Sequence, residues 1–337
     1  MELTPAVTGD TARNKAAWIS LLASVFVFAM KFAAYYMTGS TAVLSDALES
    51  TVNVLAAIVA LIVIRIASKP ADEDHPYGHG KVEYFSAAFE GGLIFFAALM
   101  IIREAIVSLL AGGAPRQLEI GVLVIGIAAI FNLLLGIYLK RTGQKQQSEA
   151  LKASGAHVIS DVWTTVGVIV GLMLLLATGL TWIDPVIAII VGLNLAYEGY
   201  KIVRKSGGGL VDEVDTEVLS DLSQALQKNR VSGVIDIHQL RIIRSGRFHH
   251  VDAHLVIPEY WNISHAHNVC DDFESSVVRD YTFDGEIAFH LDPCKRAYCR
   301  NCKMEDCPIR RHAFENQKPF TVESLTGGPK VAENIEM

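Results

Sequence analysis

Two pairs of metal-ligating side chains lie inside long apolar segments of this sequence. Glu49 and Asn53 are four residues apart in one segment. His157 and Asp161 are four residues apart in another. A helix places residues i and i+4 on one face, so each pair can present two ligands to one point. Because polar groups in hydrocarbon are costly unless they face a cavity, a partner or an ion, two facing pairs, with Asp46 one turn earlier, predict a cation site at membrane depth.

The donor types indicate which ions this site would accept. Two carboxylates balance a divalent charge, and an imidazole nitrogen beside oxygen donors suits zinc. The same donors also suit iron(II), cobalt and manganese, so zinc (Zn²⁺) is the first expectation and these ions, with cadmium, are the others. A second interpretation stays open, in which the two pairs hydrogen-bond to each other and only hold the helices together.

A polar stretch after the second apolar segment carries another cluster. Residues 72–79 read Asp-Glu-Asp-His-Pro-Tyr-Gly-His. We expect Asp72, His75 and His79 to close on one ion at the cytoplasmic surface, although a solvated polar loop would have the same composition.

Histidines recur along the last third of the chain, at the ends of predicted strands and at the start of a predicted helix. The expected ligands of a metal site there are His238, His254, His267, His290 and Asp292. Histidines scattered over the surface are the alternative. His249 and His250 are adjacent, so they must point to opposite faces of a strand, and at most one of them can join the site.

All five cysteines follow residue 269, and four of them fall within 14 positions with the spacing C-x4-C-x2-C-x4-C. In a cytosolic compartment such spacing favours metal binding over disulfides. Four thiolates in one short segment predict a closed tetrahedral zinc site, with an iron–sulfur cluster or a redox role as alternatives. The residues are Cys294, Cys299, Cys302 and Cys307.

The elements that must position the first two pairs are apolar helices. The chain has 337 residues, of which 51% are hydrophobic and 19% are charged, a balance typical of a membrane protein. A bilayer span needs about 20 residues. Six segments are long enough, near 16–37, 42–66, 85–111, 118–139, 155–178 and 183–203. No basic stripe with interleaved aromatic residues is present, which argues against a nucleic-acid partner.

Lysine and arginine collect on one side of these segments, beside the N-terminus, the polar connections 67–84 and 140–154, and the end of the sixth segment. The positive-inside rule then places both termini and both connections in the cytoplasm. We expect a multi-pass protein of the cell inner (plasma) membrane.

Ordinary soluble composition follows the sixth segment. The run Gly207-Gly208-Gly209 predicts a break and a hinge. Residues 215–229 and 264–280 read as helices, and 234–243, 249–257 and 285–291 read as strands. The order α-β-β-α-β predicts a small α+β sandwich with helices on one face of a sheet. Residues 310–337 lack periodicity and predict disorder.

Four regions are therefore expected. They are an N-terminal cytoplasmic tail (1–15), a six-helix transmembrane domain (16–206), a cytoplasmic dimerisation and metal-binding domain (207–293), and a Cys-rich segment with a disordered tail (294–337).

Three stretches of this sequence resemble the cation diffusion facilitator family of divalent metal/proton antiporters. Leu44–Ser50 (LSDALES), Pro70–Lys81 (PADEDHPYGHGK) and Ala156–Asp161 (AHVISD) are similar to its second helix, first cytoplasmic loop and fifth helix. The last third is similar to its metallochaperone-like dimerisation domain, and the histidine spacing there matches its binuclear zinc site. The resemblance covers roughly residues 15–293, and the four-cysteine tail lies outside it. Glu49 and Asn53 depart from the family's usual Asp/Asp or His/Asp pair.

The resemblance implies a homodimeric secondary transporter rather than an enzyme, which exports a divalent metal by proton antiport with alternating access. His157 is the expected proton carrier, because its unperturbed pKa is about 6.5 and metal and proton compete for its nitrogen. An ion pair between Lys81 and Asp212 is implied as the coupling between membrane and cytoplasmic parts. A non-transporting metal sensor or partner subunit, and a membrane metalloenzyme, are the competing functions.

Overall fold

The structure, a computed structural model, describes residues 7–111, 117–146 and 148–328. The chain divides into two compact units, Met1–Val211 and Asp212–Met337.

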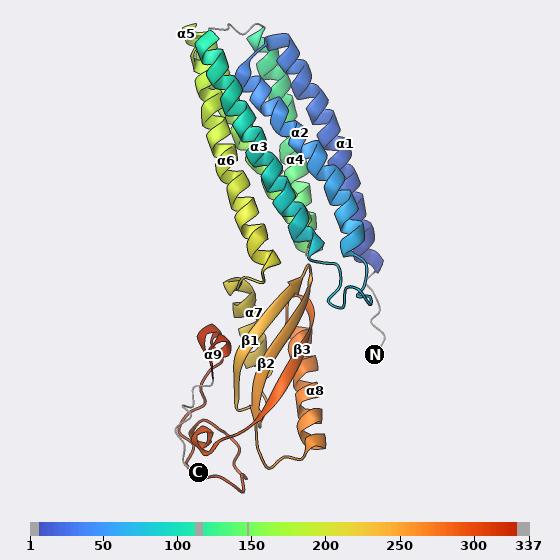
Figure 1. Cartoon of the computed structure of the whole chain (residues 1–337), viewed down its shortest axis with the longest axis vertical. Coiled ribbons are helices and arrows are strands. Elements are labelled where there is room, and N and C mark those ends of the chain that lie inside the picture. Colours follow the sequence, from blue (N-terminus) through green and yellow to red (C-terminus); the bar gives the residue numbers. More distant parts are fainter. Residues whose placement is uncertain (1–6, 112–116, 147, 329–337) are drawn as a thin grey trace. The chain divides into compact units, whose positions relative to one another are not determined.

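The first unit is a bundle of six long helices (Figure 1). All six contain a stretch long and apolar enough to cross a membrane, which confirms the six predicted spans. Large apolar side chains such as Leu22, Leu110 and Trp163 point outward and are 67%, 82% and 73% exposed, as expected for surfaces that meet lipid. The helices are α1 (Val7–Thr38), α2 (Thr41–Ala67), α3 (Val82–Ala111), α4 (Leu118–Lys145), α5 (Glu149–Thr178) and α6 (Ile183–Leu210).

Small residues let the helices of this bundle approach closely, as is common in membranes. Gly91 of α3 and Gly199 of α6 face each other. A Cβ on Gly91 would lie 2.9 Å from the carbonyl oxygen of Gly199, and a Cβ on Gly199 would lie 2.8 Å from that of Gly91. A larger side chain at either position would push α3 and α6 apart.

Two expectations about the ends of these helices were wrong. The polar stretch 140–154 is mostly helical, because its Lys, Arg and Gln residues are good helix formers and Ser148 caps the start of α5. The glycine run 207–209 does not break α6, which continues to Leu210. Gly209 packs against Tyr84 of α3, and a Cβ there would lie 2.5 Å from the Tyr84 ring. Gly209 therefore allows close packing of α6 against α3, where a hinge had been expected.

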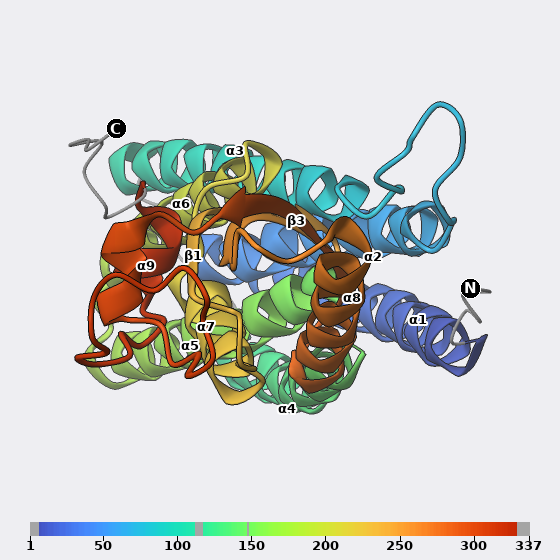
Figure 2. The ribbon, with the colours of Figure 1, turned by 90° about the horizontal axis from the view of Figure 1, so that it is seen from below.

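The second unit has the predicted order α-β-β-α-β. Its elements are α7 (Thr216–Lys228), β1 (Asp236–Ser245), β2 (Phe248–Ile257), α8 (Ile263–Asp280) and β3 (Asp284–Pro293). Strand β2 lies between β1, to which it is antiparallel, and β3, to which it is parallel. Figure 2 shows α7 and α8 along one face of the sheet. Leu222, Leu255, Phe273 and Val277 form the centre of the core between the two layers.

Strand β1 contains a β-bulge next to His238, which lies on the sheet face away from α7 and α8. His238 pairs with His254, but the next pair in register is Arg241 with Asp252. Gln239, between them, has φ 51°, a left-handed conformation that is uncommon for a residue with a side chain. The bulge bends β1 directly after His238.

The segment after β3 is folded, and this includes residues 310–328 of the tail 310–337 for which disorder was predicted. It forms a 3₁₀ turn, η1 (Arg296–Arg300), and a short helix, α9 (Val322–Thr326), and the structure describes it as far as residue 328. Phe320 and Leu325 are buried in the core of the second unit, and the Gln239 amide donates to the Gly327 carbonyl at 2.9 Å. The apolar residues here are too few to make a periodic pattern, so their tertiary role is invisible in the sequence. Residues 329–337 lie outside the described part.

Candidate metal centres

The two intramembrane pairs face each other between α2 and α5. Asn53 Nδ2 of α2 donates to Asp161 Oδ2 of α5 at 2.5 Å. His157 Nδ1 lies 3.4 Å from Asp161 Oδ1. Thr164 Oγ1, also on α5, donates to Glu49 Oε2 at 3.2 Å. The i, i+4 spacing therefore brings the four predicted ligands onto facing surfaces of two neighbouring helices.

All four side chains are buried, and only some of their polar atoms form hydrogen bonds. Glu49, Asn53, His157 and Asp161 are at most 6% exposed. Within the described chain, each retains one buried atom without a hydrogen-bond partner. These atoms are Glu49 Oε1, Asn53 Oδ1, His157 Nε2 and Asp161 Oδ1. Buried polar atoms are nearly always paired. Four unpaired atoms in one group, each able to bind a metal, are therefore better explained by a cation site than by hydrogen bonds that only hold the helices together.

Asp46, the fifth residue predicted for this site, has other partners. Its Oδ1 accepts hydrogen bonds from Lys31 Nζ of α1 at 2.8 Å and from Thr165 Oγ1 of α5 at 2.6 Å. Its Oδ2 has no hydrogen-bond partner among the described residues. Lys31 was missed by the sequence analysis, although a charged residue within an apolar span is itself a signal of function.

Glu90 of α3 was also missed. It is 6% exposed, and Ser154 Oγ of α5 donates to its Oε2 at 3.5 Å. A glutamate inside the third apolar segment could have been identified by the same reasoning as Lys31.

The loop between α2 and α3 brings Asp72, His75 and His79 together as predicted. One ligand atom from each lies within 4.8 Å of the other two. His75 Nδ1 is 3.0 Å from Asp72 Oδ1, and His79 Nε2 is 3.5 Å from Asp72 Oδ2. Desolvation acts to raise the pKa of Asp72, but hydrogen bonds from His75 outweigh it and lower that pKa, so the carboxylate stays ionised and able to bind a cation.

His238, His254 and Asp292 form a second compact group, on the sheet face opposite α7 and α8. One ligand atom from each lies within 4.8 Å of the others. Asp292 Oδ2 is 3.0 Å from His254 Nδ1 and 3.4 Å from His238 Nε2. Burial lowers the pKa of His238 although Asp236 and Asp292 act against it, which favours the neutral imidazole that binds metals.

The other two residues predicted for this group differ in position. His290 Nε2 lies 3.6 Å from Asp292 Oδ1, and the rings of His290 and His254 are 4.7 Å apart, so His290 borders the group. His267 is exposed on α8, which covers the other face of the sheet, and it does not join the group within this chain's described residues.

The neighbouring histidines of β2 point to opposite faces, as expected. His249 is buried on the helix side and its Nδ1 lies 2.7 Å from the hydroxyl of Tyr281. His250 points to the other face, where its Nδ1 lies 2.8 Å from Glu286 Oε1. Neither is in the group around Asp292.

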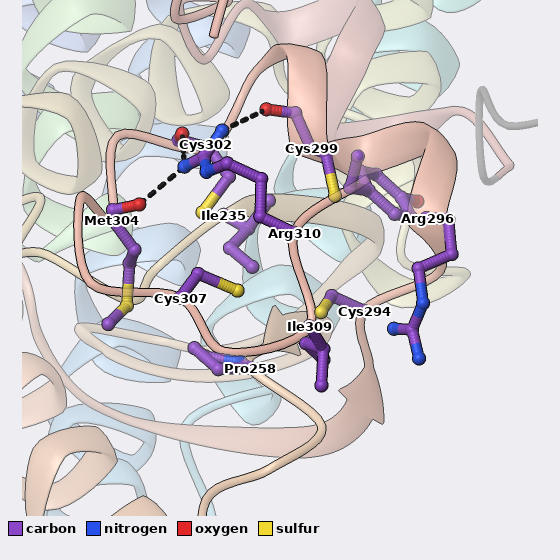
Figure 3. Close-up of a pocket in the computed structure, with 11 residues that line it drawn as sticks. Ile235, Pro258, Cys294, Arg296, Cys299, Cys302, Met304, Cys307, Ile309 and Arg310 are labelled. Carbon is purple, nitrogen blue, oxygen red and sulfur yellow. Dashed lines mark hydrogen bonds between the residues drawn. The ribbon is translucent and has the colours of Figure 1, made fainter. Parts of the chain in front are cut away.

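The four clustered cysteines line one small cavity beyond β3 (Figure 3). All four are unpaired thiols. Burial raises the pKa of the Cys294 thiol, a hydrogen bond with the Glu259 backbone acts against this, and the charge of Glu259 and the thiols of Cys302 and Cys307 act to raise it further. Cys270 lies apart from them, in the core on α8.

The predicted coupling residues lie at the ends of connections. Lys81 immediately precedes α3, and Asp212 follows α6 with φ 56°. The ion pair between them stays a prediction.

Comparison with known proteins gives two family matches. Residues 17–211 match the family model described as cation efflux transmembrane domain, and residues 214–294 match the one described as cation efflux protein, cytoplasmic domain. Three of the four clustered cysteines lie beyond both matches.

Curated relatives agree with these matches. The uncharacterized transporter sll1263 of Synechocystis sp. is 36% identical over 279 residues, 82% of this chain and 88% of the relative. The manganese efflux system protein MneS of Bacillus subtilis is 27% identical over 280 residues, 83% of this chain and 95% of its own. The cation-efflux pump FieF of Salmonella paratyphi A is 27% identical over 274 residues, 79% of this chain and 87% of its own.

Both units of the chain thus match one family, and the two matches together span the six membrane helices and the α-β-β-α-β domain. The chain therefore belongs to the cation diffusion facilitator family, whose members carry out cation efflux.

Proposed function

We propose that this chain exports a divalent transition-metal cation from the cytoplasm across the inner (plasma) membrane, in exchange for protons. Its cargo site would be formed by Glu49, Asn53, His157 and Asp161. The observation that supports this most directly is the set of four buried donor atoms without partners between α2 and α5. Two of the donors are carboxylates, which together would balance the charge of one divalent ion.

Proton exchange follows from the chemistry of the same residues. Metal and proton compete for the imidazole nitrogen of His157 and for the carboxylates of Glu49 and Asp161. In the state open to the cytoplasm, these groups release protons and bind metal. In the state open to the other side, protons displace the metal. Alternating access between the two states would then couple outward metal movement to inward proton movement.

Zinc is the first candidate for the cargo, since mixed nitrogen and oxygen donors suit it. Manganese is the second candidate, for two reasons. Three of the four donors are oxygens, which suit harder ions such as Mn²⁺. One relative that covers 83% of this chain is named as a manganese efflux protein. Iron(II), cobalt and cadmium remain in the set to be tested.

The clusters outside the membrane would bind metal without carrying it across. Asp72, His75 and His79 in the loop, and His238, His254 and Asp292 on the sheet, are compact enough to hold an ion. We propose that the cytoplasmic domain forms a homodimer, so that metal bound there would report the cytoplasmic metal load to the transporter. An ion pair between Lys81 and Asp212 would carry that coupling.

A non-transporting metal sensor is the competing function, because Asn53 stands where a second charged ligand would strengthen the site. The four unpaired donors favour transport over sensing. A membrane enzyme is disfavoured by the family match.

Flux in sealed proteoliposomes tests the proposal. Protein reconstituted with a pH dye inside should move zinc or manganese and protons in opposite directions. Glu49→Gln should abolish both fluxes, because it removes one of two charges that neutralise the ion. Glu198→Gln is the matched control: Glu198 lies on α6, is partly exposed and pairs with Lys201, so its loss should leave flux near wild type. Equal flux in both variants would reject the site, and metal binding without any flux would favour the sensor.

A further inference from the structure

We propose that Cys294, Cys299, Cys302 and Cys307 bind one zinc ion as a closed tetrathiolate site, which holds the segment after β3 against the sheet. This site is separate from the cargo path and does not depend on the proposed transport function. The segment that it organises, residues 294–316, is called the C-terminal lobe below.

The four thiols converge although they come from different parts of the lobe. Cys294 follows the end of β3, Cys299 lies in η1, and Cys302 and Cys307 lie in the turns that follow. Figure 3 shows their sulfur atoms directed into one cavity. The rest of its lining is largely apolar and includes Ile235, Pro258 and Ile309. A water-poor surround of this kind strengthens metal–thiolate bonds by excluding competing ligands.

The cavity has the size of a single ion rather than that of a cluster. Its volume is about 10 Å³, close to the space that one water molecule occupies. An iron–sulfur cluster adds two or four irons and as many sulfides within its cysteines, and it would need the lobe to open. The sulfur atoms lie farther apart than the 4.8 Å spacing of the two histidine groups, so one zinc would draw the thiols together, and four cysteines would complete its tetrahedral coordination with no position left for water.

Arg310 arranges the backbone so that the thiols face inward. Its guanidinium donates to the carbonyl oxygen of Cys299 at 3.0 Å and to that of Cys302 at 2.9 Å, and it also donates to the Met304 carbonyl. The carbonyls of the loop therefore turn toward Arg310, on one side, while the side chains turn toward the cavity. A zinc ion with four thiolates has a net charge of −2, and a neighbouring guanidinium would offset part of that charge.

Besides these hydrogen bonds, the lobe has little regular structure and little apolar packing to hold it. In residues 294–316, all of which the structure describes, the regular structure is the single 3₁₀ turn η1. The apolar contact with the sheet is small and consists of Tyr298 and Cys302 packed on Ile235 and Val256, with Cys294 and Met304 beside them. A segment with so small a core usually requires disulfides or a structural metal to stay folded.

The lobe also lies next to the histidine group of the sheet. Tyr298 packs in one apolar cluster with Val256 of β2, and Val256 lies opposite Asp292 in the register of β2 and β3. Asp292 belongs to the group with His238 and His254. A fixed lobe would therefore keep the end of β3, and with it Asp292, in place.

The test uses the full-length chain, purified in detergent with reductant and zinc, then dialysed against metal-free buffer. Elemental analysis should find one more tightly held zinc per chain in the wild type than in Cys299→Ala/Cys302→Ala. Cys270→Ala is the matched control, since that thiol lies in the core away from the lobe, and it should keep the wild-type zinc content. His254→Ala removes a ligand of the other group and should not affect this zinc.

Two measurements on the wild type keep the proposal testable if the double variant does not fold. Cobalt substituted for zinc should give the intense visible bands and sulfur charge-transfer bands of tetrahedral thiolate coordination. Zinc should protect the four lobe thiols from alkylation, and a chelator should expose all four. Any one of four results would overturn the proposal. The zinc content could be the same with and without the cysteines, or zinc could leave the alkylation of the thiols unchanged. The protein could be brown and contain iron and acid-labile sulfide, or its mass could be lowered by the formation of two disulfides.

Discussion

Lys31 Nζ lies 2.8 Å from Asp46 Oδ1, and the two side chains are 0% and 1% exposed. Lys31 comes from α1 and Asp46 from α2, one turn before Glu49. Thr165 of α5 donates to the same carboxylate oxygen, so the pair ties three helices together beside the proposed cargo site. A lysine here also places a positive charge near the carboxylates of Glu49 and Asp161, for which it would compete with the incoming metal.

Replacing Lys31 should therefore be costly. Lys31→Met keeps an unbranched, flexible side chain only one atom shorter but leaves Asp46 as an unpaired buried charge, and breaking such a pair costs about 3–5 kcal/mol. The midpoint of thermal unfolding in detergent should fall clearly. Lys201→Met is the control, because Lys201 is 52% exposed beside Glu198 and an exposed pair contributes about 0–1 kcal/mol.

The double variant Lys31→Met/Asp46→Asn separates pairing from packing. It removes both charges, so it should recover most of the stability lost in Lys31→Met. If Lys31→Met is no less stable than Lys201→Met, or if the double variant recovers nothing, the buried ion pair does not stabilise the bundle.

Asn53→Asp should alter metal selectivity. Asn53 Nδ2 now donates to Asp161 Oδ2 at 2.5 Å, and an aspartate would instead set two carboxylates against each other. Their repulsion falls when a cation or a proton lies between them. We expect tighter binding of divalent metal, a changed ranking among zinc, manganese, iron(II), cobalt and cadmium, and stronger inhibition by acid. Competition assays on reconstituted protein measure all three, and an unchanged ranking with unchanged affinity would mean that Asn53 does not contact the ion.

Much of this architecture could be predicted from the sequence, since it depends on local pattern. The six spans follow from apolar runs, and the facing of Glu49–Asn53 with His157–Asp161 follows from helical spacing. The features that could not be predicted from the sequence depend on contacts between residues far apart in the chain. Gly209 lies within α6 and packs against Tyr84 of α3, and Phe320 is buried because a core formed by distant elements accepts it. Neither fact has a periodic signature.

Lys31 is an intermediate case. Its position within an apolar segment was visible, but lysine stems often extend along apolar surfaces toward water, so the residue alone does not predict a buried ion pair. Only the packing of α1 against α2 places Asp46 opposite it.

His254→Ala should remove bound metal from the sheet group. His254 contacts Asp292 and borders both His238 and His290, so its loss takes away the central nitrogen donor. His250→Ala is a suitable control on the same strand and the same face, since His250 pairs with Glu286 instead. Isothermal titration of zinc into the full-length protein should show fewer sites for His254→Ala and an unchanged number for His250→Ala. Equal site numbers in the two variants would reject the group as a metal site.

Cys270 should react slowly with alkylating reagents at neutral and mildly alkaline pH. Burial, with Glu274 nearby, raises its pKa to about 11, compared with about 8.5 for a free cysteine. Between these two values the folded protein keeps a proton that the unfolded chain has lost, so the contribution of Cys270 to stability is fully present below about pH 8.5 and is lost as the pH rises toward 11. Peptide mapping of alkylation against pH should give a midpoint well above 8.5 for Cys270, and Glu274→Gln should lower it. The Cys270→Ala variant should lose less stability than wild type across the same pH range. A midpoint near 8.5 would show that this thiol is accessible and that the α8 face carrying it is not packed as described.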